Sequence, residues 1–190
     1  MMVLIGKSCS GKDTVVKELK KMGYESIVTY TTRPMRENEI DGVNYHFVSQ
    51  EIFNSMISNN EFAEWKSYKT ENGNWMYGNR IIDYTNGKKV ILLTPDGYEK
   101  IQKFANETGI SLTAIYLKVS NKTLKKRMKN RDVDIKESKR RYKADKRDFR
   151  HIEDIVDYIV INENRDAFET ALICKEMDEI KERYHKYREY

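Results

Sequence analysis

The sequence predicts a three-layer α/β fold, in which helices cover both faces of a parallel β-sheet. Apolar, β-branched runs alternate with helical patterns along most of the chain, which is typical of parallel sheets. The first apolar run ends in a G-x-x-x-x-G-K loop, from Gly6 to Lys12, that leads into a helical pattern. The stretch of about 30–85 breaks the alternation, and we interpret it as an inserted α+β subdomain.

Each element of this fold is predicted from its own pattern. Core strands are predicted where short apolar runs occur, at 1–5, 25–30, 90–93, 112–119 and 157–162. Helices are predicted where apolar residues recur at helical spacing, at 14–23, 97–109, 121–131 and 165–187. In the insert, 43–49 and 61–68 are predicted as antiparallel strands that flank a helix over 50–60, and Asn72-Gly73 indicates a tight turn.

The composition indicates a soluble globular protein. The 190 residues are 39% hydrophobic and 34% charged, and no apolar run approaches the roughly 20 residues that span a membrane. We see no signal peptide before the first strand, and Cys9 and Cys174 are too few for a disulfide framework, so we expect a reducing cytoplasm. The net charge of +5 is concentrated between 125 and 150, where a solvated helix face is the simplest interpretation.

The loop at Gly6–Lys12 is predicted to be a phosphate-binding loop (P-loop), because it has the strand before it and the helix after it that this motif requires. Backbone N–H groups of residues 8–13 would cradle phosphates at the start of the helix, and Lys12 would reach the γ-phosphate. The motif normally continues with Ser or Thr, whose hydroxyl holds Mg2+, but here Asp13 follows and Thr14 comes after it.

The loop and three further motifs together resemble the guanylate kinase family. These motifs are "TYTTRPMRENEIDGVNYHFVS", "NNEFAEW" and "MYG", and the similarity continues in order to "LKKRMKNR" and "DYIVIN". The resemblance implies a P-loop NTPase fold in one domain, with a core of 1–29 and 86–190, an acceptor-binding insert of about 30–85 and a short lid of about 128–145. It also implies transfer of the γ-phosphoryl group of ATP to GMP, giving ADP and GDP, with Mg2+ as cofactor.

The resemblance assigns site residues by position. The ATP phosphates would be bound by Gly6, Ser8, Ser10, Gly11, Lys12, Asp13 and Thr14. The catalytic cations would be Lys12, Arg127, Arg131 and Arg141. GMP would be bound by Thr29, Arg33, Arg36, Tyr45, Glu64, Tyr77 and Asn79.

The chemistry of these residues fits the roles that the resemblance implies. Arg33 and Arg36 offer planar guanidinium groups that bind phosphate oxygens bidentately. A carboxylate such as Glu64 can accept from the adjacent N1–H and N2–H₂ of guanine, a pair that adenine lacks. Arg127 and Arg131 are four residues apart and therefore share one helix face. Of the two arginines after the lid segment, we favour Arg141 over Arg140.

The chain departs from the family pattern at several positions. Leu93 stands where an acid is usual after the third strand, with only Asp96 nearby, and Asn79 stands where Ser or Thr is usual. About four extra residues lie between Trp65 and Tyr77. With the acid at Leu93 missing, we predict that Asp13 binds the magnesium ion of MgATP; the alternative is a charge that only complements the helix dipole.

Three alternative functions each fit part of the sequence. A kinase of the same build could act on dGMP or a modified monophosphate, and Asn79 and Leu93 keep this open. A non-catalytic guanylate-kinase-like module is disfavoured by Lys12, Arg127 and the intact loop. A nucleic-acid binder would explain the charge but none of the motifs. We therefore expect nucleotides as partners, with no nucleic acid and no membrane; monomer and homodimer both stay open.

Overall fold

The core of the molecule is a five-stranded parallel sheet with β1 (Met2–Ile5) at its centre. The computed structural model describes residues 1–70, 73–85, 87–129 and 135–188. The strand order is β2-β7-β1-β8-β9, and every neighbouring pair runs parallel. The other four strands are β2 (Glu25–Ser26), β7 (Lys89–Leu93), β8 (Thr113–Lys118) and β9 (Tyr158–Ile161).

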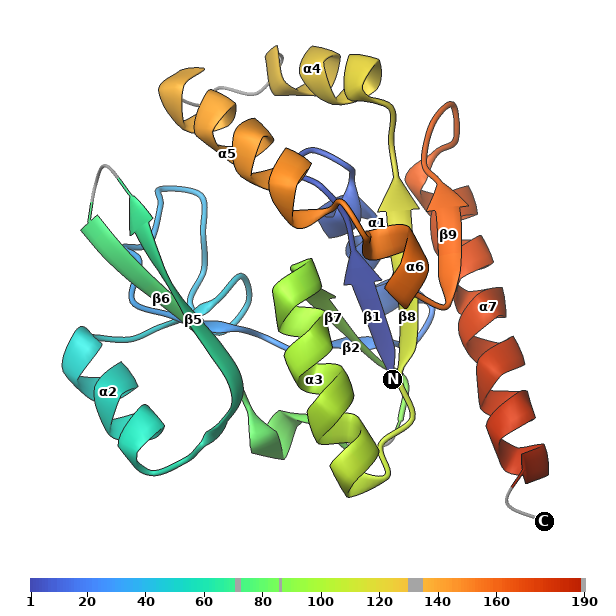
Figure 1. The fold of residues 1–190 in the computed structure, drawn as a ribbon, viewed down its shortest axis with the longest axis horizontal. Helices are drawn as coiled ribbons and strands as arrows, with labels where there is room; N and C mark the ends of the chain where they lie inside the picture. The colour runs from blue at the N-terminus through green and yellow to red at the C-terminus, as the bar shows by residue number, and fades with distance from the viewer. Residues whose placement is uncertain (71–72, 86, 130–134, 189–190) are drawn as a thin grey trace.

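The side chains of β1 point alternately to the two faces of the sheet and contribute to a hydrophobic layer on each face. Val3 and Ile5 join a cluster with α3 (Pro95–Thr108) and α6 (Ile152–Ile155), whereas Met2 and Leu4 join a second cluster with α1 (Lys12–Lys21) and α7 (Ala167–Arg188). Because successive side chains of a strand point to opposite faces, one apolar run serves both clusters. The predicted three-layer α/β fold is therefore confirmed (Figure 1).

Local sequence signals determine where the helices begin and end. The side chain of Thr94 caps α3 by accepting from the Gly97 N–H, Pro95 occupies the first turn, and Gly109 ends the helix in a left-handed conformation (φ 71°). Ser49 caps α2 (Gln50–Ser58) by accepting from the Ile52 N–H. No helix among the described residues is long and apolar enough to cross a membrane.

A second sheet is formed by the region between 30 and 80. Its strand order is β4-β3-β6-β5, with β3 (Tyr30–Thr31), β4 (His46–Phe47), β5 (Phe62–Thr70) and β6 (Gly73–Arg80); a short 3-10 helix, η1 (Ile81–Asp83), follows β6. The strand predicted over 25–30 is in fact two strands, β2 in the core sheet and β3 in the second sheet. The chain changes partner between them: Ile27 N–H donates to Val90 in the core, whereas the Thr29 carbonyl accepts from His46 N–H.

The prediction that 43–49 and 61–68 are antiparallel strands is confirmed for 61–68, which pairs antiparallel with β6, and is wrong for 43–49. β4 pairs parallel with β3, while β3 and β5 both pair antiparallel with β6, so β4 and β5 point the same way. The helix predicted between them is present as α2. The turn predicted at Asn72-Gly73 includes Asn72, which lies outside the described residues.

Two further helices, α4 (Asn121–Lys129) and α5 (Ile135–Asp148), follow β8. The helix predicted over 121–131 is present as α4, whereas most of α5 falls within the lid expected at about 128–145. The sequence of α5, IKESKRRYKADKRD, contains too few apolar residues to show helical periodicity, which explains why this helix was missed. The division of the chain into core, insert and lid remains a prediction.

Gly78 in β6 provides a test of how tightly the second sheet is packed. A Cβ atom at this position would lie 2.9 Å from the ring of Phe62 and 3.0 Å from that of Phe53, and these two rings stack with centroids 4.5 Å apart. We expect Gly78→Ala to lower the free energy of unfolding by about 1–3 kcal/mol, because the stacked rings must separate. Urea denaturation would measure this, with Lys69→Ala on the exposed face of β5 as control. Equal free energies of unfolding for the two variants would show that the rings can move apart without loss of stability.

Candidate active site

The loop between β1 and α1 is shaped to surround an anion. Cys9 (φ 65°) and Gly11 (φ 96°) both adopt left-handed conformations, and a Cβ at Gly11 would lie 2.8 Å from Nδ2 of Asn162. Gly11 is thus required both for its backbone angle and for the close approach of Asn162. The Lys12 ammonium folds back over the loop and donates to the carbonyls of Gly6 (2.5 Å) and Lys7 (3.1 Å).

The loop lines a cavity of about 350 Å³, which also has Arg127, Asn162 and Arg165 in its wall. Arg127 comes from α4 and donates to the carbonyls of Cys9 (3.3 Å), Ser10 (3.2 Å) and Asn162 (3.2 Å). The structure therefore brings Lys12 and Arg127, predicted from distant segments, to one cavity. Asn162 and Arg165 were not singled out from the sequence, although Asn162 directly follows β9, at the sheet edge where polar site residues gather.

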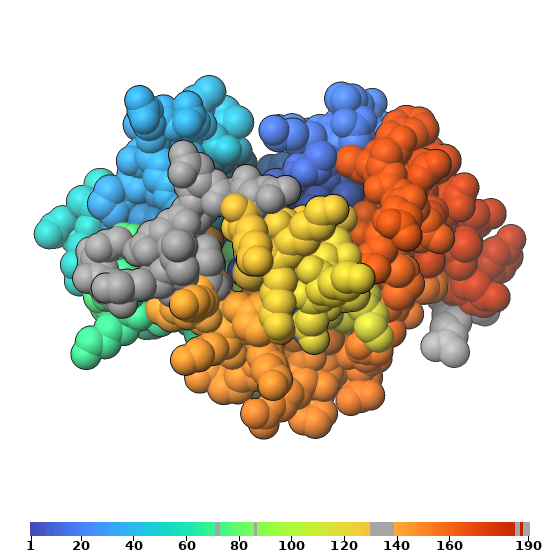
Figure 2. Space-filling view, turned by 90° about the horizontal axis from the view of Figure 1, so that it is seen from above, coloured from blue at the N-terminus to red at the C-terminus, as the bar shows by residue number. Residues whose placement is uncertain are grey.

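One contact at the loop could not be expected from any motif. The Ser8 N–H donates to the carboxylate of Asp145 in α5, at 2.7 Å. Seen from above, α4 (yellow) lies near the middle of this face, and α5 (orange) lies below it in the view (Figure 2). Arg141 lies on α5, half-buried, whereas Arg131 falls outside the described residues.

Asp13 and Thr14 lie in the first turn of α1 and line the same cavity. Both are exposed, so their oxygens are accessible to a ligand in the cavity. Leu93 at the end of β7 is buried, and Asp96 pairs with Lys66 (3.0 Å) and Lys100 (3.4 Å). Within the ranges that the structure describes, no group of three or more acidic, His or Cys side chains could hold a metal ion by itself.

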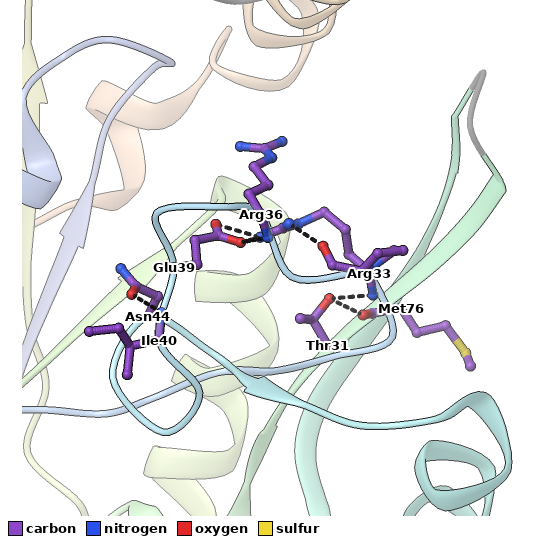
Figure 3. A network of polar contacts seen from close by, with 8 residues as sticks. Thr31, Arg33, Arg36, Glu39, Ile40, Asn44 and Met76 are labelled. Carbon is purple, nitrogen blue, oxygen red and sulfur yellow. Dashed lines mark hydrogen bonds and ion pairs between the residues drawn. The ribbon is translucent and has the colours of Figure 1, made fainter.

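A second cluster of predicted site residues gathers at the four-stranded sheet. Arg33 is buried and donates through one nitrogen to both oxygens of Glu39, at 2.7 and 2.9 Å (Figure 3). Its guanidinium also lies 5.3 Å from the ring centre of Tyr45. Glu39 further accepts from the Arg36 N–H, while the Arg36 side chain is exposed and extends away from this pair. Glu39 was missed as a partner because a glutamate in a loop gives no sign of what it will contact.

Tyr45 and Tyr77 lie side by side, with ring centroids 5.9 Å apart. Burial raises the pKa of Tyr45, and the charges of Tyr77 and Asp13 add to the effect. Asp13, at the start of α1, therefore lies within electrostatic reach of Tyr45.

The remaining three predicted residues form a chain of hydrogen bonds. The Thr29 hydroxyl donates to Oδ1 of Asn79 (2.8 Å), and Nδ2 of Asn79 donates to Oε1 of Glu64 (2.5 Å). Glu64 and Asn79 are directly opposite in the β5–β6 ladder, which accounts for their contact. Burial raises the pKa of Glu64, and the hydrogen bond from Asn79 opposes this effect.

The Arg33–Glu39 pair should contribute a pH-dependent part of the stability. The hydrogen bond and the charge of Arg33 keep the pKa of Glu39 below its ordinary value of 4.5, against the opposing effect of burial. This stabilisation is present above pH 4.5 and is lost as the pH falls through the lowered pKa of the folded state. We expect Glu39→Gln to cost about 3 kcal/mol at pH 7, and the difference from wild type to shrink toward pH 3.

Urea denaturation at the two pH values would measure the effect. Glu18→Gln, which breaks an exposed pair with Lys21, should cost less than about 1 kcal/mol and serves as control. A cost at Glu39 that is the same at both pH values would show that the pair does not stabilise through its charge.

Comparison with known proteins shows the family of this chain. The family model described as "Guanylate kinase" matches residues 1–184. A guanylate kinase of Helicobacter hepaticus is 32% identical over 92% of this chain and 88% of its own length, and one of Sulfurimonas denitrificans is 33% identical over 95% and 89%. The crystal structure of guanylate kinase from Anaplasma phagocytophilum shares the fold, with a TM-score of 0.68 at 24% identity, and covers 95% of this chain and 85% of that one. The resemblance predicted from the motifs is confirmed, and the chain belongs to the guanylate kinase family.

Proposed function

We propose that the protein transfers the γ-phosphoryl group of ATP to GMP, giving ADP and GDP. A phosphate oxygen of GMP forms the new bond to the γ-phosphorus, while the bond from the γ-phosphorus to the bridging β–γ oxygen breaks and ADP leaves. The attacking oxygen is already ionised at pH 7, so no general base is required, and catalysis consists of positioning and charge neutralisation. The observation that carries the proposal is the cavity of the loop, lined by Lys12 and Arg127, together with a second cluster of Arg33, Tyr45 and Tyr77 in which Tyr45 lies within electrostatic reach of Asp13.

On the donor side, loop N–H groups would bind the ATP phosphates, with Gly6, Ser8, Ser10 and Gly11 shaping the cradle. Lys12 now donates to two carbonyls of its own loop, and its flexible stem lets the ammonium turn to the γ-phosphate. Arg127 already borders the cavity and would neutralise the charge of the transferring group. Arg131 and Arg141 remain proposed as further catalytic cations.

The side-chain oxygen atoms that line the cavity fit Mg2+ as cofactor. Asp13 and Thr14 bring hard oxygen atoms to the cavity wall, and Mg2+ typically uses one or two carboxylates together with phosphates and water. Asp13 would hold the ion, directly or through water, since Leu93 supplies no side-chain oxygen at the end of β7. The bound ion would neutralise the phosphate charge that Asp13 alone repels.

On the acceptor side, Arg33, Arg36, Tyr45 and Tyr77 would bind the phosphate of GMP. Arg36 is exposed and extends from the loop, so its guanidinium is accessible to an incoming phosphate. Glu64 would bind guanine through N1–H and N2–H₂, with Asn79 and Thr29 bonded in series behind its carboxylate. A reducing cytoplasm is the proposed location, and no nucleic-acid or membrane partner is proposed.

The second candidate is a kinase of the same build that acts on dGMP or a modified monophosphate. Asn79 and Leu93, which depart from the family pattern in and beside the base site, favour it. A coupled assay that detects ADP, run with a panel of nucleoside monophosphates as acceptors, would distinguish the two candidates.

Glu64→Gln tests the base assignment. The substitution keeps the shape of the side chain but turns a donor toward N1–H or N2–H₂ of guanine. We expect kcat/KM for GMP to fall by a factor that corresponds to a loss of about 2–4 kcal/mol of transition-state stabilisation. We also expect kcat/KM for AMP to rise relative to that for GMP. If the variant phosphorylates GMP as well as wild type does, the base pocket lies elsewhere.

Asp13→Ser tests the proposed magnesium ligand. Removing the carboxylate should tighten metal-free ATP, because a repulsion of up to roughly 3 kcal/mol before screening is removed. It should also weaken the coupling between Mg2+ and ATP, and lower kcat less than Lys12→Ala does. Calorimetric titration of ATP with and without Mg2+ measures this coupling. Unchanged coupling would leave Asp13 as a charge that stabilises the helix end.

A further inference from the structure

The β5–β6 hairpin carries a half-buried lysine, Lys66, among the residues proposed to bind the acceptor. Its partner across the ladder is Tyr77, and side chains that are directly opposite in an antiparallel pair lie on the same face of the sheet. Lys66 also comes two residues after Glu64 on β5, so these two side chains share that face. One ammonium group therefore lies on the face that carries both a residue proposed to bind the base and a residue proposed to bind the phosphate.

A row of ring contacts connects Lys66 to Arg33. The Arg33 guanidinium lies 5.3 Å from the ring centre of Tyr45, and the ring centres of Tyr45 and Tyr77 are 5.9 Å apart. The row continues through Tyr68, whose ring centre is 5.6 Å from that of Tyr77 and 5.5 Å from the Lys66 ammonium. Three phenol rings thus lie in a row with a cation at each end.

We propose that Lys66 is a further residue of the acceptor site, which binds the phosphate of the acceptor nucleotide, and that Asp96 holds its ammonium until the phosphate arrives. This inference rests on the proposed function, because it takes the acceptor to be a nucleoside monophosphate. Lys66 lies in the stretch between Trp65 and Tyr77 that is about four residues longer than the family pattern, so the motifs alone give it no role.

The ion pair between Lys66 and Asp96 can be exchanged for a pair with phosphate. Nζ of Lys66 donates to Oδ2 of Asp96 at 3.0 Å, and the two side chains are 37% and 47% exposed. Pairs as exposed as this one are weak, because water and salt screen both charges. A phosphate dianion carries more charge and more acceptor oxygens than a carboxylate, so it can take over the ammonium. Asp96 keeps Lys100, at 3.4 Å, as a partner when Lys66 leaves.

The charge on Lys66 is present at neutral pH. Burial lowers the pKa of Lys66, but the hydrogen bond and the charge of Asp96 outweigh this effect, and the pKa is raised overall. Lys66 is therefore an ammonium at pH 7, and it can donate to phosphate oxygens without first taking up a proton.

The test compares the binding of GMP with that of guanosine, which has the same base and sugar but no phosphate. Lys66→Met keeps the length of the side chain and removes its charge. We expect GMP to bind about 10- to 100-fold more weakly, because a hydrogen bond between charged groups is lost, and guanosine to bind within about twofold of wild type. Calorimetry measures the affinity for GMP, and competition against GMP measures that for guanosine.

Two further variants at lysine positions serve as controls. Lys66→Arg keeps a cation and should recover part of the lost GMP affinity. Lys69→Met makes the same change as Lys66→Met on the exposed face of the same strand, and it should bind GMP and guanosine as wild type does. Urea denaturation of each variant shows whether it is folded under the conditions of the binding measurement.

Asp96→Asn tests whether Asp96 competes with the phosphate for Lys66. The substitution keeps the shape of the side chain and removes its charge, so GMP should bind about threefold more tightly. In the Lys66→Met background the same substitution should leave GMP affinity unchanged, since the ammonium on which Asp96 acts is gone.

Three results would overturn the inference. Equal losses for GMP and guanosine in Lys66→Met would show that Lys66 supports the hairpin and does not bind the phosphate. An unchanged GMP affinity in Lys66→Met would show that its ammonium does not reach the acceptor. Equal tightening by Asp96→Asn with and without Lys66 would show that Asp96 does not act through Lys66. A wild-type protein that binds GMP no more tightly than guanosine would instead overturn the proposed function.

Discussion

The backbone carbonyl of Ser10 is the point at which four segments of the chain are joined. It accepts from Nδ2 of Asn162 at 2.7 Å and from the guanidinium of Arg127 at 3.2 Å. Asn162 in turn accepts from the Thr170 hydroxyl in α7. Ser10, Asn162 and Thr170 are all buried, so the two hydrogen bonds among them are shielded from competition with water. The shape of the loop is therefore fixed by α4, β9 and α7 as well as by its own sequence.

The second sheet is organised around a different constraint, the register of the β5–β6 hairpin. Glu64 is opposite Asn79 and Lys66 is opposite Tyr77, so residues proposed to bind the base and residues proposed to bind the phosphate follow one another along a single ladder. A shift of one residue would turn every one of these side chains to the opposite face. The stacked rings of Phe53 and Phe62 against Gly78 hold this register from the α2 side.

The elements predicted correctly from the sequence are those with an apolar pattern of their own. The runs at 90–93 and 112–119 and the helix over 97–109 coincide closely with β7, β8 and α3, since burial on the sheet determines their composition. The run at 25–30 was misread, because nothing in a six-residue run shows where the chain changes sheets. Helix α5 was missed because its stability does not come from an apolar stripe.

The residues of the candidate site also divide into those that could be predicted from the sequence and those that could not. Lys12 and Arg127 could be predicted, because their motifs fix them relative to a loop and a helix. Glu39, Asp145 and Asn162 could not, because their roles depend on contacts between segments that are far apart in sequence. The hydrogen-bond order from Thr29 to Glu64 likewise follows from strand register, which no single segment encodes.

The contact between Ser8 and Asp145 links loop occupancy to the attachment of α5. A backbone N–H makes one strong hydrogen bond, so any anion that takes this amide must displace the carboxylate that now accepts from it. The two binding equilibria are linked and the effect is reciprocal. If a bound anion weakens the attachment of α5 to the loop by some factor, then attachment of α5 weakens the binding of the anion by the same factor. The affinity of the loop for anions is therefore a property of α5 as much as of the loop.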